Sequence, residues 1–123
     1  MSYPMDFDDW GRSIHEWARG KGFYDRERIT LPNDSTEPRY APARTVPNPS
    51  LPSEKLMLIV TEVAEVQEAL RDGDTEAEAE EVADILIRVL DYATWRGINL
   101  DREVSKKMGK NRDRPHLHGR AAF

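Results

Sequence analysis

The chain has 123 residues and a formal net charge of -5, and it contains no cysteine. This length is typical of one domain. The lack of cysteine excludes a disulfide framework and a thiolate metal site. Hydrophobic residues make up 38% of the chain and charged residues 33%, so we expect a modest core and a homo-oligomer that shares apolar surface. The net negative charge argues against binding to a nucleic acid polymer.

No segment is typical of membrane insertion or export. The longest apolar run covers residues 56–60, which is far too short to cross a membrane. Asp6, Asp8 and Asp9 lie near the N-terminus, which shows no signal-peptide pattern. Together with the lack of cysteine, these features predict a cytoplasmic protein without a membrane partner.

The first predicted element is a short amphipathic helix that ends near residues 20–22. Large apolar side chains recur there at steps of three and four, at Phe7, Trp10, Ile14 and Trp17. Aromatic side chains at this spacing usually belong to a core. The alternative is that Trp10, Trp17 or Tyr24 stacks on a nucleobase.

Residues 24–52 form a proline-rich segment without helical or strand periodicity. Because proline restricts the backbone and lacks an amide donor, we expect no regular element there. A connection of this length is either functional or a linker. Three roles stay open at this point: a lid over a ligand, a strap along a neighbouring subunit, and a mobile linker.

Two long amphipathic helices follow. The first is predicted from Ser53, as its N-cap, to about Asp72. The second is predicted over about residues 76–95, after a turn at residues 73–75 in which Asp74 or Thr75 caps the new helix. The expected buried stripes are Ile59, Val63, Val66 and Leu70 on the first helix and Val82, Leu86, Val89 and Ala93 on the second.

A last helix is predicted over about residues 100–112, with Asn99 as its N-cap and a thin apolar seam at Val104 and Met108. No segment shows a strand pattern. The chain therefore predicts one all-α domain over residues 1–123. Its parts are an N-terminal helix with the proline-rich segment (1–52), core helices (53–112) and a basic tail (113–123).

Two pairs of carboxylates occupy the long helices, Glu62 with Glu65 and Glu81 with Asp84. Three residues correspond to roughly 300° of helical rotation, so the members of each pair lie on one side of their helix. If the helices pack antiparallel, four carboxylates face one another, and they repel unless a cation lies between them. Oxygen ligands favour Mg2+, with Mn2+ as a second choice. The alternative is a solvated acidic face.

Basic and amide side chains gather near the C-terminus. Lys107, Asn111 and Arg114 follow at steps of four and three, so they share one helical face and suit a polyphosphate. The alternative is a basic helix end that complements its own dipole, which does not account for Asn111. His118 in the same tail is interpreted as a surface residue rather than a catalyst.

These motifs together resemble the MazG-like nucleoside triphosphate pyrophosphohydrolases, especially their compact single-domain forms, which include phage proteins. The resemblance runs from about Ser53 to Gly119. Its motifs are Glu62-x-x-Glu65, Glu81-x-x-Asp84 and Lys107-x-x-x-Asn111-x-x-Arg114-Pro115-x-x-His118-Gly119.

The resemblance implies an all-α fold of the four-helix-bundle type, assembled as a homodimer or homotetramer. The long proline-rich loop expected between the first and second helices lies outside the range of the resemblance. It implies Mg2+-dependent hydrolysis of a nucleoside triphosphate, often a deoxynucleotide, to the monophosphate and pyrophosphate. The implied metal ligands are Glu62, Glu65, Glu81 and Asp84. The implied substrate contacts are Lys107, Asn111 and Arg114. Glu62 or Glu65 is expected to accept the proton of the attacking water.

One departure separates the chain from the resembled pattern. The first motif is often Glu-Glu-x-x-Glu, and Thr61 stands at its first place here, so the site has one acid fewer. Two rival functions stay open. One is a related pyrophosphatase for a phosphoribosyl or modified nucleotide. The other is a non-catalytic helical module that oligomerises.

Overall fold

The computed structural model describes residues 6–31 and 44–115. It contains helices α1 (Phe7–Gly20), α2 (Leu51–Asp72), α3 (Thr75–Trp95) and α4 (Leu100–Arg112), and strands β1 (Arg28–Leu31) and β2 (Arg44–Pro47). The predicted tail residue His118 lies outside the described residues. The chain is mostly helical, as predicted.

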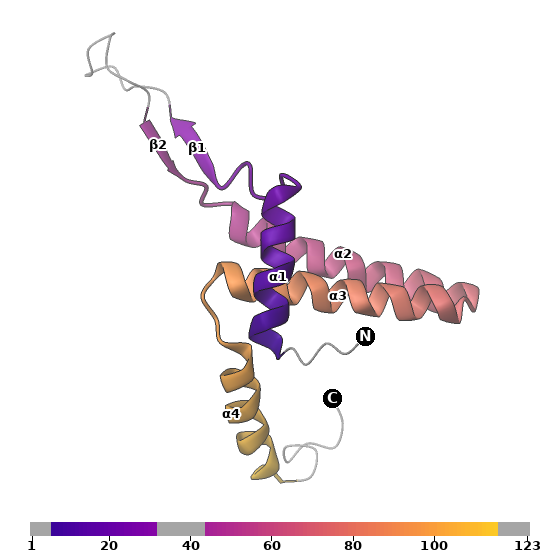
Figure 1. Ribbon diagram of the computed structural model, residues 1–123. Coiled ribbons are helices and arrows are strands. Elements are labelled where there is room, and N and C mark those ends of the chain that lie inside the picture. Colours follow the sequence, from indigo (N-terminus) through magenta and orange to yellow (C-terminus); the bar gives the residue numbers. More distant parts are fainter. Residues whose placement is uncertain (1–5, 32–43, 116–123) are drawn as a thin grey trace.

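The centre of the fold is the antiparallel pair of α2 and α3, which lie side by side in Figure 1. Gly73 ends α2 with a φ of 70°, a left-handed conformation that glycine adopts without strain. Asp74 then caps α3, because its carboxylate accepts a hydrogen bond of 3.0 Å from the amide of Ala77. The predicted turn and this cap are confirmed.

The predicted start of α2 was three residues late. The helix begins at Leu51 after Ser50, so Ser53 lies inside it and is not the N-cap. Pro52 occupies the first turn, where its fixed φ suits a helix and its missing amide hydrogen has no partner to lose. Asn48 supports this start, since its side-chain oxygen accepts from the amide of Ser50 at 3.0 Å.

The prediction that residues 24–52 hold no regular element was wrong. Strands β1 and β2 pair antiparallel, with Arg28 opposite Pro47 and Leu31 opposite Arg44. Figure 1 shows this ribbon extending away from the helices. A four-residue strand is stabilised by pairing with a distant segment, so its own short sequence carries little signal. Pro47 is tolerated because it lies at the end of its strand.

Helix α1 crosses the α2–α3 pair and packs mainly on α3 (Figure 1). Its predicted end near residue 20 is confirmed. Asp101, in the first turn of α4, accepts hydrogen bonds from the amides of Phe7 and Asp8 and so joins α4 to the start of α1. The cap of α4 at Asn99 is also confirmed, by a 3.0 Å bond from the amide of Arg102.

The buried faces of α2 and α3 agree with the predicted stripes only in part. Ala93 is buried as predicted, and Ile59, Val66 and Val89 are partly buried. Val63 and Leu70 of α2 are 47% and 60% exposed, whereas Glu62 on the same helix is buried. Val82 and Leu86 of α3 are also exposed. Apolar residues occupy more than one side of α2. The spacing of apolar residues therefore does not identify the side that packs against α3. Among the described residues, no helix is long and apolar enough to cross a membrane.

Candidate functional site

Three of the predicted acidic residues meet between α2 and α3. Glu62, Glu81 and Asp84 each offer a carboxylate oxygen, and these oxygens all lie within 4.8 Å of one another. The turn explains the arrangement, because Glu62 and Asp84 are equally many residues from Gly73. An antiparallel hairpin therefore places them at the same level.

The fourth acid, Glu65, lies one helical turn beyond Glu62 and is exposed. It shares a hydrogen bond with Glu81, which requires a proton between the two carboxylates. This bond, followed by desolvation and by the negative charges of Glu65 and Asp84, raises the pKa of Glu81 to about 7. All four predicted acids thus occupy one cluster.

The donor set of this cluster fits a hard divalent cation. Carboxylate oxygens of three of its members, Glu62, Glu81 and Asp84, lie close enough together to share one ion. One oxygen of Glu81, Oε2, is buried and accepts no hydrogen bond from any described residue. A buried acceptor without a partner is costly, and a cation would satisfy it. Thr61 does not contribute, because its hydroxyl donates to the carbonyl of Met57 at 3.0 Å.

Sequence reasoning missed Arg88. Its Nε donates to Glu62 Oε1 at 2.7 Å, and the Glu62 side chain is only 9% exposed. Arg88 lies four residues after Asp84, hence on the same side of α3. That spacing from Asp84 is the signal in the sequence that points to Arg88.

A cavity of about 520 Å³ opens beside the cluster, between α1 and the α2–α3 pair. Glu62, Asp84 and Arg88 line it from the long helices, and Trp17 and Phe23 line it from α1 and the turn that follows. The two aromatic rings meet edge to face at 5.5 Å, and both are about half exposed. The aromatic residues named from the sequence therefore have different positions. Trp17 borders the cavity, whereas Tyr24 is buried in the core.

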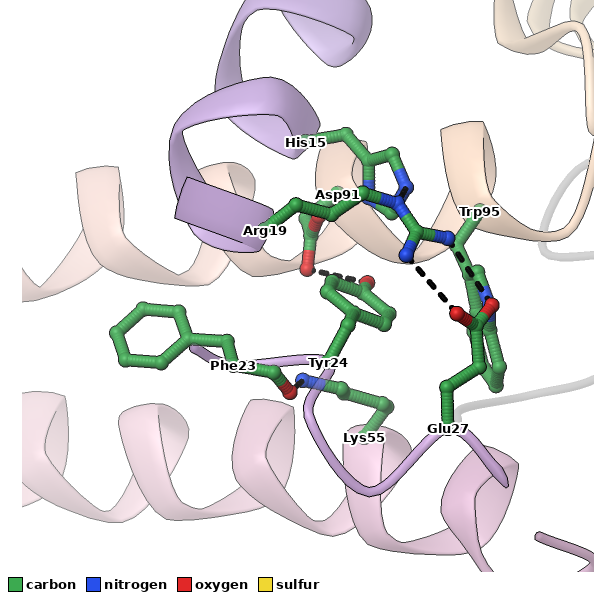
Figure 2. A network of polar contacts seen from close by, with 8 residues as sticks. All are labelled: His15, Arg19, Phe23, Tyr24, Glu27, Lys55, Asp91 and Trp95. Atoms are coloured by element: carbon green, nitrogen blue, oxygen red, sulfur yellow. Dashed lines mark hydrogen bonds and ion pairs between the residues drawn. The ribbon is translucent and has the colours of Figure 1, made fainter. Parts of the chain in front are cut away.

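A polar network that includes Asp91, which lines this cavity, joins α1 to α3 (Figure 2). Asp91 of α3 accepts from the Tyr24 hydroxyl at 2.6 Å and from His15 Nδ1 at 2.8 Å. Arg19 Nε donates to His15 Nε2 at 2.9 Å. His15 therefore carries its proton on Nδ1, and its role is to join α1 to α3.

The network continues to the segment before β1. Arg19 forms a two-pronged ion pair with Glu27 at 2.9 and 3.0 Å, and the indole nitrogen of Trp95 donates to the same carboxylate at 2.9 Å. The hydrogen bonds from Arg19 and Trp95 lower the pKa of Glu27 to about 2. Burial and the bond to Asp91 raise the pKa of Tyr24.

The structure does not bring the predicted substrate residues to the acidic cluster within one chain. Lys107 and Asn111 lie on α4, which packs on α1 and extends away from the α2–α3 pair in Figure 1. Arg114 lies two residues beyond the end of that helix. Lys107 and Arg114 are exposed, and Asn111 Nδ2 reaches the sulfur of Met108 at 4.0 Å.

A comparison with known protein families finds a match. The model of a family described as the MazG nucleotide pyrophosphohydrolase domain matches residues 52–118, which is more than half of the chain. No curated protein and no solved structure matches. The matched range includes both carboxylate pairs and the basic residues of α4, and it leaves α1 and the ribbon outside.

Proposed function

Because the chain belongs to the MazG nucleotide pyrophosphohydrolase family, whose members hydrolyse phosphoanhydride bonds, we propose a specific reaction for it. The protein converts a nucleoside or deoxynucleoside triphosphate and water into the monophosphate and pyrophosphate, with Mg2+ or Mn2+ as cofactor. The observation that carries this proposal is the convergence of Glu62, Glu81 and Asp84 within 4.8 Å beside an open cavity. A triphosphate needs such a cation, because four uncompensated carboxylates would repel it.

The acids divide into two roles in this proposal. Glu62, Glu81 and Asp84, with Glu65 beside them, hold the cation. When bound, the cation supplies positive charge for the phosphate chain and lowers the pKa of a water molecule. Glu65 is the better placed proton acceptor, because it lies outside the group of three and is exposed. Glu62 is the alternative, although Arg88 already engages one of its oxygens.

The proposal assigns Lys107, Asn111 and Arg114 to the phosphates or the nucleotide of a neighbouring site. Since α4 extends away from its own acidic cluster, these residues would reach a substrate held by a second copy of the chain. The exposed side chains of Val63, Leu70, Val82 and Leu86 support assembly as a homodimer or homotetramer, because they leave apolar surface uncovered on α2 and α3.

Substitution of the acids tests the site. We expect Glu62→Gln and Asp84→Asn each to abolish pyrophosphate release from a mixed pool of nucleotides with Mg2+, while circular dichroism shows intact helices. Each change removes the negative charge of one carboxylate of the cluster. Glu68→Gln is the matched control, since Glu68 lies exposed on the same helix outside the cluster, and it should keep wild-type turnover.

Retained turnover in both cluster variants would refute the site. Chromatography of the products separates the rival substrates, because a phosphoribosyl or modified nucleotide would be consumed in place of the common triphosphates. A non-catalytic helical module would consume none of them and would show no cation uptake by calorimetry.

A further inference from the structure

Arg88 stands at the boundary between two cavities. It lines the cavity of about 520 Å³ together with Glu62 and Asp84. It also lines a second cavity of about 270 Å³ together with Lys55. Its side chain is 35% exposed and is held at one end by the bond from Nε to Glu62. The guanidinium therefore lies next to the acidic cluster and in contact with open space.

Most hydrogen-bond donors of Arg88 have no acceptor among residues 6–31 and 44–115. A guanidinium has five N–H donors, and among the described residues only Nε has an acceptor, which is Glu62. Lys55 differs, because its ammonium donates to the carbonyl of Phe23 at 2.8 Å and lies 4.0 Å from the centre of the Tyr24 ring. Lys55 thus supports the fold. The two terminal nitrogens of Arg88 have no acceptor in the described part of the chain, so they can make a forked contact.

The charge around the larger cavity explains why such a contact matters. Its lining includes three carboxylates, Glu62, Asp84 and Asp91, and Arg88 is the one basic residue among the described residues that line it. Asp91 is already bound by His15 and Tyr24. The negative charge of a phosphate chain in this cavity would have to be neutralised by a basic side chain. The basic residues of α4 do not provide it within one chain, because α4 extends away from the α2–α3 pair.

We infer that Arg88 is a phosphate-binding residue of the substrate site and that it also competes with the divalent cation for Glu62. The inference rests on the proposed function and adds a residue to it. Two positive charges next to one buried carboxylate repel each other. A cation at Glu62 therefore weakens the hold of that carboxylate on Arg88, and the guanidinium then binds the incoming phosphate as a fork.

The test measures binding without turnover. Calorimetry follows Mn2+ uptake without any phosphate, and then inorganic tripolyphosphate uptake with Mg2+ present, so that no base preference enters. For Arg88→Gln we expect Mn2+ to bind several-fold more tightly, because a competing positive charge is gone. We expect tripolyphosphate to bind on the order of tenfold more weakly, since one charge-assisted contact is lost.

Two variants control this experiment. Arg96→Gln removes an exposed arginine that caps the C-terminal end of α3. The guanidinium of Arg96 lies 5.5 Å from the centre of the Trp95 ring, and Arg96 does not line either of the cavities lined by Arg88. This variant should behave as wild type in both titrations. Arg88→Lys keeps the charge without the fork, so it should restore part of the tripolyphosphate affinity.

The outcomes separate this inference from the proposed function. If the wild-type protein binds both probes and Arg88→Gln binds tripolyphosphate equally well, the inference is wrong and the proposed function stands. If Arg88→Gln loses Mn2+ affinity as strongly as Glu62→Gln does, Arg88 only positions Glu62 and the inference is again wrong. If the wild-type protein takes up neither probe, both proposals fail. Thermal melting of each variant identifies loss of folding.

Discussion

The carboxylate of Glu27 joins α1 to α3 next to the candidate site. It lies between α1 and α3 and accepts hydrogen bonds from Arg19 and Trp95, which lower its pKa to about 2. A carboxylate with a lowered pKa binds fewer protons in the folded than in the unfolded state. It therefore stabilises the fold above its ordinary pKa near 4.5, and this stabilisation is lost as the pH falls towards 2.

We therefore expect Glu27→Gln to melt at a lower temperature than wild type at neutral pH, with a difference that shrinks as the pH falls from about 4.5 to about 2. Thermal denaturation followed by circular dichroism over this pH range measures it. Glu68→Gln, at an exposed position, should melt like wild type at every pH. A difference that persists unchanged at pH 2 would contradict the role given to the ionised carboxylate.

At the scale of elements, the docking of α1 on α3 depends on a close approach at Gly11. A methyl group there would overlap the hydroxyl of Thr94 and lie 3.2 Å from the carbonyl oxygen of Leu90. The carbonyl belongs to the backbone of α3, so α1 would have to move away. We expect Gly11→Ala to lower the free energy of unfolding by about 1–3 kcal/mol, measured by urea denaturation.

Gly20→Ala is the matched control at the other end of α1, since a methyl group there meets nothing within 4 Å. Alanine also restricts the unfolded chain more than glycine does. The control variant should therefore be as stable as wild type or slightly more stable. Equal stability of Gly11→Ala and Gly20→Ala would show that α1 does not pack on α3 as closely as described.

At the scale of the whole molecule, one chain leaves a large apolar surface uncovered. Val63 and Leu70 lie two helical turns apart on α2, and both are exposed. If a second copy covers this face, burial of a charge there would be unfavourable. We expect Leu70→Glu to shift the protein from an oligomer to a monomer at micromolar concentration, as measured by size-exclusion chromatography with light scattering.

Ser105→Glu introduces the same charge at an exposed polar position of α4 and should leave the oligomer intact. If the wild-type protein is itself a monomer, or if Leu70→Glu keeps the wild-type mass, the apolar face does not form the contact between copies. In that case the assignment of Lys107, Asn111 and Arg114 to a neighbouring site would lose its support.

Local sequence determined the order of the helices, the caps at Asp74 and Asn99, and the spacing within both carboxylate pairs. It also carried the family resemblance, which the match to residues 52–118 confirms. These features depend on interactions within about four residues along the chain, so a short segment carries nearly the whole signal.

Tertiary structure decided the rest. Only the packing of α2 on α3 buries Glu62 while Val63 beside it stays exposed, and only that packing joins Glu62 to Arg88. The ribbon and the contacts of Asp91 with His15 and Tyr24 likewise join segments far apart in the chain. Helical periodicity indicates which residues share a side of a helix. Which side is buried depends on the surface that packs against it.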